Sequence, residues 1–514
     1  MLTSWQEVQQ QLESSGIALE PNAKLTQDSR QLFAGDLFVA IRGTELDGSK
    51  FIPQVLEKEA SVILVSSQCE PQNYQDLELG KTSLFVIENL EFRLPEIAKA
   101  FYLGESGHLP VLGVTGTNGK TSISYMLAQM FRANDGSEIG VIGTMGIGSI
   151  DDLKPSNNTT PGVTDVYRIF RDFKRDEKHQ FSGVIMEVSS HALQQNRVKG
   201  VNFDVAIFTN LTLDHLDYHG TMEEYFLAKT KLFTEYAPKN AIVNFDDEYG
   251  RRLTNMVNPK SRLVVYGQNE QVKTFSEYVF IESFECHSGG LQVSLEWQFD
   301  SQKESVKLDL PIYGEFNCSN LAAVFASAKA MGWHLPSCHF SRLTSVPGRL
   351  ELFTKPHMPV AIVDYAHTPD ALEQSLAGVR AHLSGRLFLI FGCGGDRDST
   401  KRPIMGKIAE SMADIVIVTN DNPRTEAPAA IVEDIKNGFQ HPKKHRVIFD
   451  RKEAIRFALQ HAAEDDAILI AGKGHETYQI IGQRVIDYDE REFTKGTLLV
   501  LSQQAIDQKV QTND

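Results

Sequence analysis

"VLGVTGTNGKTSISYMLAQM", residues 111–130, decides the fold of this 514-residue chain. Its first five residues predict a buried strand, the glycines that follow predict a tight turn, and apolar residues at helical spacing come next. A glycine-rich turn between a strand and a helix binds phosphate, because its backbone N–H groups point toward the anion. The stretch therefore predicts an α/β fold with a parallel sheet and a phosphate site at the sheet edge.

The strict P-loop pattern, GxxxxGK(S/T), would require a glycine at position 114, where this chain has Val114. The essential groups are nevertheless present. We expect the backbone N–H groups of 115–119 to hold phosphate oxygens, Lys120 to reach the β and γ phosphates, and the Thr121 hydroxyl to bind Mg2+. The alternative is a glycine-rich turn with an incidental Lys-Thr pair. The strand directly before the turn favours phosphate binding.

Length and composition limit the class of protein. A chain of 514 residues is long enough for about three domains. A formal net charge of −16 argues against nucleic acid or an anionic membrane surface as the main partner. No apolar run reaches the length of about 18 residues that a membrane span needs, and the five cysteines show no CxxC spacing. We expect a cytoplasmic protein with free thiols, no nucleic-acid partner and no membrane insertion, acting as a monomer on small molecules.

Three blocks follow one another along the chain. Residues 1–103 carry short β-rich runs and predict a small α/β domain. Residues 104–344 alternate continuous apolar strands with helices, which predicts a parallel sheet covered on both faces. Residues 345–514 repeat this alternation. The fold class that we predict is α/β with three domains, the central one a P-loop ATPase-like domain.

Polar residues at two predicted strand ends of the central block suit a metal. Glu187 ends the strand in "GVIMEVSS", although a strand-end glutamate on its own is more often structural. "FTNLTLDHLDYHG", residues 208–220, places two aspartates and two histidines within six residues. Zinc is the rival interpretation, but no cysteine or HExxH spacing supports it. A Mg2+ site with few protein ligands and substrate phosphates fits better.

Four loops of the third block each follow an apolar strand. Arg397, Asn422, Arg424 and Glu476 lie in these loops and offer cationic and anionic groups at strand ends. Such a set suits a zwitterionic ligand, and solvated loop charges are the alternative. "GCGGDR" has an arginine where the last glycine of a dinucleotide fingerprint would stand, which argues against a dinucleotide domain.

The motifs, taken together, resemble a known family. "QDSR", "GVTGTNGKT", "TTPG", "MEVSSHAL", "TNLTLDHLDYHG", "AKTKLF", "VPGRLE", "VDYAHTPDAL", "GGDRD", "DNPR" and "GKGHE" occur in the order found in the muramyl ligases of peptidoglycan synthesis. The resemblance covers essentially the whole chain. It implies an N-terminal domain for a uridine nucleotide, a central domain for ATP and a Rossmann-like C-terminal domain for the incoming amino acid. It also implies an amide-forming ligase that works through an acyl phosphate.

The resemblance further implies the ligands and the residues that hold them. The small-molecule substrates would be ATP, a UDP-N-acetylmuramoyl dipeptide and, because "DNPR" accompanies it, meso-diaminopimelate. The residues implied for ATP are Gly116, Thr117, Asn118, Gly119, Lys120, Thr121, Ser122, Asn317, Arg349, Asp364 and His367. Those implied for the UDP substrate are Ser29, Thr44, Glu45, Leu46, Asn158, Thr159, Thr160, Ser189, Gln195 and Arg197. Those implied for diaminopimelate are Arg397, Asp421, Asn422, Pro423, Arg424, Gly472 and Glu476.

A modified lysine is also implied. Lys229 matches the lysine that is carbamylated in this family, and the implied catalytic residues are Lys120, Lys229 and His215. Thr121 and Glu187 would hold one Mg2+, and His215 with the Lys229 carbamate would hold a second. The sequence alone favours an ordinary lysine of an amphipathic helix at position 229, and Lys231 is the rival for the modified lysine if the register differs by two.

Three other functions remain open at this point. A noncatalytic nucleotide-binding module is the least favoured, because polar loops follow so many of the predicted strands. A P-loop switch or motor would hydrolyse ATP without an acceptor, and it would have no use for three separate ligand-binding blocks. A folylpolyglutamate synthetase shares the loop, the ligase chemistry and the lysine carbamate, but it would lack the N-terminal "DSR" block and the "DNPR" loop. Phosphate release that depends on both the UDP substrate and an amino acid distinguishes all of them.

Overall fold

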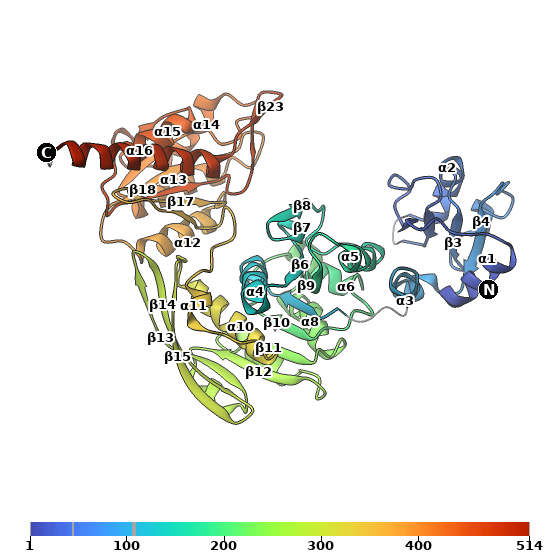
Figure 1. Cartoon of the computed structure of the whole chain (residues 1–514). Coiled ribbons are helices and arrows are strands. Elements are labelled where there is room, and N and C mark those ends of the chain that lie inside the picture. The colour runs from blue at the N-terminus through green and yellow to red at the C-terminus, as the bar shows by residue number, and fades with distance from the viewer. Residues whose placement is uncertain (1, 44–45, 105–108, 513–514) are drawn as a thin grey trace. The chain divides into compact units, whose positions relative to one another are not determined.

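The chain forms two compact units, Met1–Val265 and Tyr266–Asp514 (Figure 1). The computed structural model describes residues 2–43, 46–104 and 109–512. The boundary between the units lies inside the segment predicted as the central domain, residues 104–344. Each unit is a mixed α/β structure rich in parallel strands, so the predicted fold class is confirmed.

The N-terminal part of the first unit is a four-stranded, fully parallel sheet with the order β1-β2-β3-β4. Its strands are β1 (Leu25–Thr26), β2 (Leu37–Ala40), β3 (Val62–Ser66) and β4 (Ser83–Ile87). α1 (Trp5–Ser14) and α3 (Leu90–Leu103) pack on one face, and α2 (Ile52–Glu57) packs on the other. The helices cover both faces because consecutive residues of each strand are apolar.

A second sheet of the first unit carries the phosphate turn. β5 (Val111–Thr115) lies between β9 and β10 and runs parallel to both. The neighbouring strands are β6 (Glu138–Gly143), β7 (Gly146–Ser149), β8 (Asp152–Lys154), β9 (Phe181–Glu187), β10 (Val205–Phe208), β11 (Asn240–Asn244) and β12 (Arg262–Gly267). Its helices are α4 (Lys120–Asp135), α5 (Val163–Arg175), α6 (Ser190–Gln194), α7 (Leu216–His219), α8 (Met222–Thr234) and α9 (Glu248–Thr254). The carboxyl ends of β5, β9 and β10 therefore share one sheet edge.

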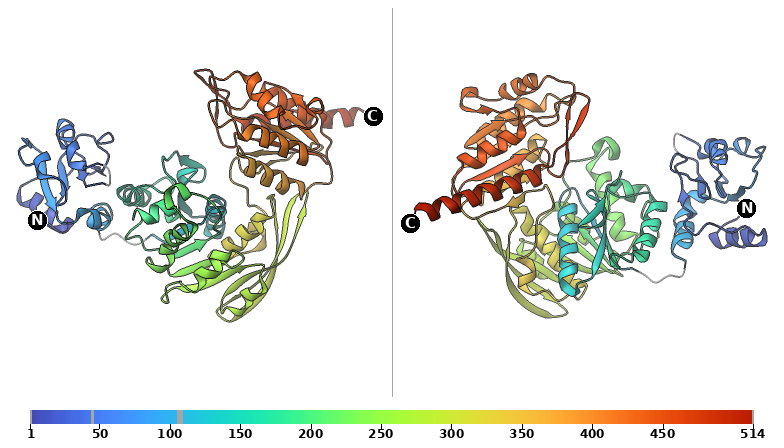
Figure 2. Two further views of the ribbon diagram at one scale, coloured as in Figure 1. Left: turned by 180° about the vertical axis from the view of Figure 1, so that it is seen from behind. Right: turned by 45° about the horizontal axis from the view of Figure 1, so that its top comes forward.

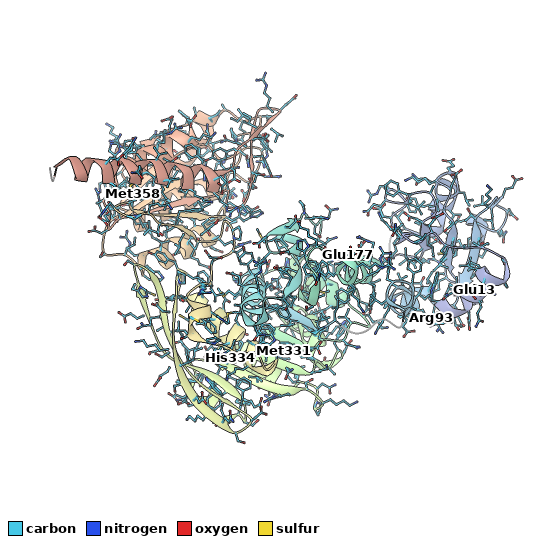
Figure 3. The ribbon with its side chains drawn as sticks, in the orientation of Figure 1. Glu13, Arg93, Glu177, Met331, His334 and Met358 are labelled. Atoms are coloured by element: carbon cyan, nitrogen blue, oxygen red, sulfur yellow. The ribbon has the colours of Figure 1, made fainter. Side chains whose placement is uncertain are left out.

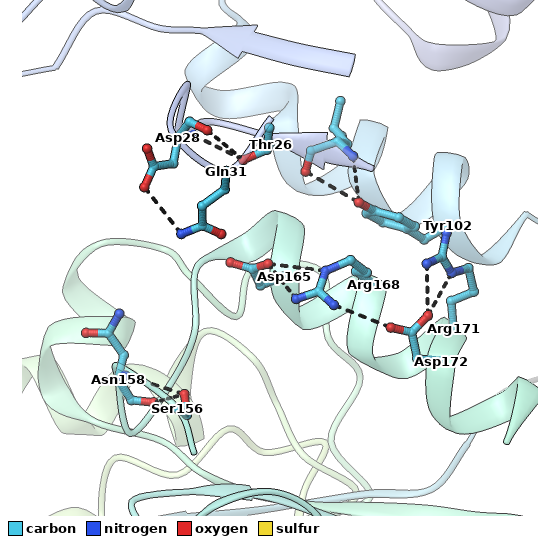
Figure 4. Close-up of polar contacts among 11 residues, drawn as sticks. Thr26, Asp28, Gln31, Tyr102, Ser156, Asn158, Asp165, Arg168, Arg171 and Asp172 are labelled. Atoms are coloured by element: carbon cyan, nitrogen blue, oxygen red, sulfur yellow. Dashed lines mark hydrogen bonds and ion pairs between the residues drawn. The ribbon is translucent and has the colours of Figure 1, made fainter. Parts of the chain in front are cut away.

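Helix α3 is tied to α5 within this unit (Figure 4). The Tyr102 hydroxyl accepts a hydrogen bond from the Leu25 backbone N–H at 2.7 Å. The Arg171 guanidinium lies over the Tyr102 ring, 4.9 Å from its centroid. Burial raises the pKa of Tyr102 to about 12, so the phenol stays protonated and keeps this contact at any physiological pH.

The second unit begins with an antiparallel meander. Its strands are β13 (Tyr278–His287), β14 (Gly290–Phe299) and β15 (Gln302–Leu310). Buried and partly buried residues alternate along β14, in keeping with the alternation of "LQVSLEWQF". α10 (Phe316–Ala330) packs against β13 and β14, and Met331 and His334 follow its C-terminal end (Figure 3).

The C-terminal sheet of the second unit has the order β16-β17-β21-β18-β19-β20. Its strands are β16 (Glu351–Phe353), β17 (Val360–Asp364), β18 (Leu387–Phe391), β19 (Ile415–Val418), β20 (Arg446–Val447) and β21 (Ala467–Ala471), and β16 alone among them is antiparallel. α12 (Pro369–Arg380), α13 (Lys401–Met412) and α14 (Pro428–Lys436) cover one face, and α15 (Arg451–His461) and α16 (Glu490–Thr512) cover the other (Figure 2). A short hairpin, β22 (Tyr478–Ile481) and β23 (Arg484–Asp487), leads into α16.

Two expectations from composition can be compared with the structure. All five cysteines are free thiols. None of the helices in the described part of the chain has the length and apolarity that crossing a bilayer requires.

Candidate functional site

The phosphate turn joins β5 to α4 and depends on two glycines with positive φ. Gly116 has φ +145° and Gly119 has φ +86°. A Cβ at Gly116 would lie 1.8 Å from the Thr209 Oγ1, so only glycine fits there. Gly119 directly precedes Lys120, and Lys120, Thr121 and Ser122 begin α4. The turn therefore presents a helix N-terminus, whose backbone N–H groups and dipole favour an anion.

Asn210, just after β10, supports this turn. Its backbone carbonyl accepts from the Thr117 N–H at 2.9 Å, and its Oδ1 accepts from the Asn118 N–H at 2.9 Å. The Thr209 hydroxyl donates to the Asn118 carbonyl at 2.6 Å. The expectation that all the amides of 115–119 point at phosphate is therefore wrong for Thr117 and Asn118, because the neighbouring strand end binds both. The polar run after an apolar strand is the sequence signal that could have indicated this support.

Two lysines converge on one oxygen of the turn. Lys120 Nζ donates to the carbonyls of Gly116 at 3.0 Å and Thr117 at 2.9 Å. Lys229 Nζ, from α8, donates to the same Gly116 carbonyl at 2.9 Å and lies 4.7 Å from the Tyr225 ring centroid. Lys229 is only 2% exposed. Burial and the nearby charge of Lys120 hold the pKa of Lys229 well below its ordinary value, which favours the neutral amine.

The structure distinguishes Lys229 from its rival. Lys231 Nζ donates to the Gln194 side chain of α6 at 3.2 Å, and this contact is exposed. Residues two apart on a helix point to different sides, so only one of the two lysines can face the turn. That lysine is Lys229. Its carbamylation stays a prediction.

Glu187 is fixed at the edge of β9, in register with Val114 of β5. Its Oε1 accepts from the Thr144 N–H at 3.1 Å and its Oε2 accepts from the Thr144 hydroxyl at 3.0 Å. The side chain is 1% exposed, and a Cβ at Gly143 would come within 2.3 Å of its Oε1. In the described part of the chain, no three His, Cys, Asp or Glu side chains group as a metal cage. The Glu187 carboxylate is an oriented oxygen donor at this sheet edge, and its role toward Mg2+, like that of the Thr121 hydroxyl, stays a prediction.

His215 lies in the loop after β10, with a left-handed backbone, φ +52°. Its backbone N–H donates to Asp214 Oδ1 at 2.9 Å, and its side chain is 45% exposed. The imidazole packs edge-on against His191, with 4.9 Å between ring centroids, and its centroid lies 6.0 Å from that of Tyr225. The Tyr225 ring also contacts Lys229, so it adjoins both His215 and Lys229, the two predicted ligands of the second metal.

Residues predicted for the muramoyl dipeptide gather beside Glu187. The Thr160 hydroxyl donates to the Glu187 carbonyl at 2.7 Å and accepts from the Ser189 N–H at 3.0 Å. The Thr159 hydroxyl lies 3.1 Å from that of Thr144. The structure therefore brings both threonines and Ser189 to the sheet edge that carries Glu187.

Arg197 and Gln195 complete this group. Arg197 Nη1 donates to the Thr160 carbonyl at 3.0 Å, and its Nε donates to Gln195 Oε1 at 2.9 Å. Burial lowers the pKa of Arg197, but the guanidinium remains a cation that can pair with a substrate carboxylate. Asn158 lies nearby in the chain, where its backbone N–H donates to the Ser156 hydroxyl at 3.4 Å (Figure 4).

The residues predicted for the UDP group lie in the N-terminal part. Ser29 is 7% exposed, and its hydroxyl donates to Gln54 Oε1 at 3.1 Å. Leu46 is 61% exposed, and its carbonyl accepts from the Gly43 N–H at 2.8 Å. Thr44 and Glu45 lie outside the described residues.

In the second unit, Arg424 and Arg397 both lie close to Gly394. A Cβ at Gly394 would be 3.0 Å from Arg424 Nη1 and 3.7 Å from Arg397 Cγ. Arg424 has φ +50°, and its Nη1 donates to the Gly395 carbonyl at 2.8 Å. The two predicted carboxylate-binding arginines are thus brought together.

Asp421, Pro423 and Gly472 border the same loops. A Cβ at Gly395 would lie 1.9 Å from the Pro423 carbonyl, and one at Gly472 would lie 2.8 Å from Asp421 Oδ2. Asp421 Oδ2 is buried and has no hydrogen-bond partner among the described residues. A buried carboxylate oxygen in this state suits a cationic ligand group.

Asn422 and Glu476 interact with each other and with Lys473. Asn422 Nδ2 donates to Glu476 Oε2 at 3.1 Å, and Asn422 Oδ1 accepts from Lys473 Nζ at 3.2 Å and from the Ile480 N–H at 2.9 Å. The sequence predicted that Asn422 bonds the ligand, but here its carboxamide orients protein groups. Lys473 was missed, although it follows an apolar strand between two glycines in "GKGHE".

A buried ion pair, Arg451–Glu490, lies next to the end of β21. Arg451 Nε pairs with Glu490 Oε2, and Arg451 Nη2 donates to Glu490 Oε1 at 3.0 Å and to the Ala471 carbonyl at 2.9 Å. The Tyr488 hydroxyl also donates to Glu490, at 2.9 Å. Arg451 is 2% and Glu490 0% exposed. The pair joins the start of α15 to the start of α16, and Arg451 also bonds the end of β21.

Two residues of the second unit that were predicted for ATP make internal contacts. Asp364 accepts from the Leu350 N–H at 2.8 Å, the Ala366 N–H at 3.0 Å and the Ser375 hydroxyl at 2.7 Å, and burial raises its pKa. Asn317 Nδ2 donates to the Tyr313 carbonyl at 2.7 Å. These contacts give both residues a structural role that the motifs did not indicate.

Arg349 and His367 are less constrained. The Arg349 guanidinium lies 5.7 Å from the Tyr365 ring centroid. His367 is exposed, and its Nδ1 lies 2.8 Å from the Tyr365 carbonyl oxygen. Their roles toward ATP stay predictions.

Comparison with known proteins identifies the family. Three family profiles match in chain order: "Mur ligase family, catalytic domain" at residues 23–102, "Mur ligase middle domain" at 114–328, and "Mur ligase, glutamate ligase domain" at 348–474. Relatives named UDP-N-acetylmuramoyl-L-alanyl-D-glutamate–2,6-diaminopimelate ligase occur in Coxiella burnetii and Haemophilus influenzae. The Coxiella burnetii relative is 40% identical over 92% of this chain and 95% of its own length. The Haemophilus influenzae relative is 41% identical over 90% of this chain and 94% of its own length.

A solved structure with the same name is similar as well. It is 31% identical, has a TM-score of 0.71, and aligns over 98% of this chain and 99% of its own. The three profiles, the two sequence relatives and this structure agree along nearly the whole length. On these grounds the chain belongs to the Mur ligase family.

Proposed function

We propose that this protein is an ATP-dependent ligase that joins meso-diaminopimelate to UDP-N-acetylmuramoyl-L-alanyl-D-glutamate in cytoplasmic peptidoglycan precursor synthesis. The observation that carries the proposal is the 40% identity over 92% of the chain to a ligase named for these substrates. The "DNPR" loop, with Arg424 beside Arg397, supports the choice of amino acid. The three-domain division at 103 and 344 and the monomeric state stay predictions.

Amide formation from a carboxylate is uphill at neutral pH, so the carboxylate needs a leaving group. The D-glutamyl γ-carboxylate attacks the γ-phosphorus of ATP, which breaks the bond to ADP and forms an acyl phosphate. The diaminopimelate amine then attacks the acyl carbon, loses a proton and expels phosphate. Each ligation consumes one ATP and releases ADP and phosphate.

Lys120 and the start of α4 serve the first step. Triphosphate and carboxylate are both anions, and their repulsion must be neutralised before they meet. Lys120 Nζ donates to the carbonyls of Gly116 and Thr117, and these bonds hold the ammonium at the phosphate turn. There its charge would offset that of the triphosphate.

The oxygen and nitrogen donors at this edge suit Mg2+. Thr121 and Glu187 would hold one ion, and His215 with a carbamate on Lys229 a second. Mg2+ bound there would neutralise the charge of the triphosphate. Glu187 is suitable because Thr144 fixes both its oxygens and so orients its lone pairs.

Lys229 has the properties that carbamylation requires. Only a neutral amine attacks carbon dioxide, and the attack forms an N–C bond and releases one proton. The lowered pKa of Lys229 supplies the neutral amine. The product is an anion with two hard oxygens, which would suit both Mg2+ and the neighbouring Lys120 ammonium.

Phosphate release tests the proposal. The purified protein is incubated with ATP, Mg2+ and the UDP-muramoyl dipeptide, with a panel of amino acids that includes meso-diaminopimelate, L-lysine and L-glutamate. We expect release only when both the UDP substrate and meso-diaminopimelate are present. Release without an acceptor would indicate a switch or motor, and release with a folate and glutamate would indicate a folylpolyglutamate synthetase.

A further inference from the structure

A fully buried lysine lies under the predicted amino-acid site. Lys473 is 0% exposed, and its Nζ donates to Glu476 Oε2 at 2.9 Å and to Asn422 Oδ1 at 3.2 Å. We propose that Lys473 is a positioning residue for the incoming amino acid, because its ammonium holds Asn422 and Glu476 in the arrangement that receives the substrate. The inference rests on the proposed function.

The three side chains form a closed triangle of hydrogen bonds. The third side is the bond from Asn422 Nδ2 to Glu476 Oε2, at 3.1 Å. Each member bonds both others, so none can change rotamer without losing two hydrogen bonds. Asn422 and Lys473 are 51 residues apart in sequence, and the triangle therefore fixes two separate strand-end loops against each other.

The triangle selects which oxygen of Glu476 faces outward. Oε2 accepts both hydrogen bonds, from Lys473 and from Asn422, whereas Oε1 accepts none from the described residues. The Glu476 side chain is 19% exposed, so the carboxylate borders solvent on one side. Oε1 is thus the acceptor offered to an ammonium group, and Lys473 holds it in place.

The Lys473 side chain is fully buried, and the residue lies between Gly472 and Gly474, whose φ angles are +122° and +52°. A neutral side chain could fill the same space. Burying a charge costs desolvation energy that a methionine of similar length would avoid. What the ammonium adds is the fixed orientation of its two partners.

Lys473→Met tests the proposal in the full-length protein. Phosphate release is measured while each of the three substrates is varied in turn. We expect the KM for meso-diaminopimelate to rise about tenfold or more, because two charge-assisted hydrogen bonds are lost. The KM values for ATP and for the UDP substrate should stay within about twofold. Lys473→Arg keeps the positive charge and should recover part of the affinity.

Lys436→Met is the matched control. Lys436 also pairs with a glutamate three residues away, Glu433, at 3.0 Å in the same unit, but the two side chains are 31% and 64% exposed. It should leave all three KM values unchanged. An unchanged KM for diaminopimelate in a folded Lys473→Met, or an equal rise in all three KM values, would overturn the proposal.

A second variant tests the proposal in case Lys473→Met does not fold. Lys473→Met leaves Glu476 without its cation, so we pair it with Glu476→Gln to remove both charges. If the single variant does not fold, the double variant should melt close to the parent and is compared with Glu476→Gln alone. Because Lys473 acts through Glu476, adding Lys473→Met to Glu476→Gln should change the diaminopimelate KM by less than about twofold, and a further rise of about tenfold would contradict a positioning role. If the parent itself shows no amino-acid-dependent phosphate release, the proposed function fails instead.

Discussion

Lys120 and Lys229 donate hydrogen bonds to the same acceptor, the carbonyl oxygen of Gly116. Two ammonium groups so close would repel each other, and Lys229 is the one that is completely buried. The arrangement therefore assigns the charge to Lys120 and the neutral amine to Lys229. This division gives the two lysines different chemistry at one turn.

Replacing Lys120 with alanine should lower turnover by about 10²-fold or more, since a preorganised charge at the transferred phosphoryl group is lost. Binding of the UDP substrate, measured by calorimetry, should stay within about twofold, because its predicted contacts use other residues. A loss of UDP-substrate affinity as large as the loss of ATP affinity would contradict the assignment of Lys120 to ATP.

Lys229→Ala should be inactive if the lysine acts as a carbamate. Short-chain carboxylic acids should restore part of the activity, because they place two oxygens in the vacated space. The measurement is phosphate release against acetate or propionate concentration. Lys231→Ala is the control, since the Lys231 side chain bonds Gln194 in an exposed contact, and it should keep parental activity. Full activity in Lys229→Ala would exclude the carbamate.

The lowered pKa of Lys229 also predicts a pH effect on stability. The unfolded chain binds a proton at Lys229 up to about its ordinary pKa of 10.5, and the folded chain releases it at a lower pH. Stability therefore rises with pH across that interval. Lys229→Met removes the free-energy cost of burying this amine, so the variant should melt at a higher temperature than the parent near neutral pH. The difference should shrink as pH approaches 10.5, and a difference that grows with pH would contradict burial as the cause.

Gly116→Ala should destabilise the first unit by about 2 kcal/mol or more and abolish ATP turnover. Its Cβ would lie 1.8 Å from Thr209 Oγ1, at φ +145°. Gly136→Ala is the matched control, because this residue caps the same helix at φ +79° with open space around the new Cβ. It should cost about 1 kcal/mol and leave turnover intact, as measured by urea unfolding and phosphate release. Equal effects would show that the Thr209 contact is unimportant.

Arg424→Ala should raise the KM for meso-diaminopimelate far more than that for ATP. The second amino-acid centre of diaminopimelate bears a carboxylate, which Arg424 with Arg397 can bind by bidentate hydrogen bonds. L-lysine lacks that carboxylate, so the parent should discriminate against it by up to about 10⁴-fold. Arg424→Lys keeps the charge but loses the planar fork and should recover little. Equal turnover of both amino acids by the parent would refute this role.

The sequence predicts those parts of the structure that depend on neighbouring residues. Residues 111–130 give the strand, turn and helix, and the apolar run before Glu187 predicts a strand that ends at that residue. The sequence does not reveal hydrogen bonds between segments far apart in the chain. Asn210 binds Asn118 across 92 residues and Asn422 binds Glu476 across 54, so neither partner follows from local spacing. The positive φ of Arg424 is likewise imposed by tertiary contacts.

The buried Arg451–Glu490 pair has a consequence for local unfolding. Arg451 begins α15 and Glu490 begins α16, and Arg451 also bonds the carbonyl of Ala471 at the end of β21. The segment 472–489 is therefore anchored at both of its ends to one buried guanidinium, whose separation from Glu490 would require hydrating two charges. Opening any part of this segment widely would require breaking that pair. In native-state hydrogen exchange, the amides of the β22–β23 hairpin and of the turn at Lys473 should therefore share one opening free energy and exchange as a single cooperative unit.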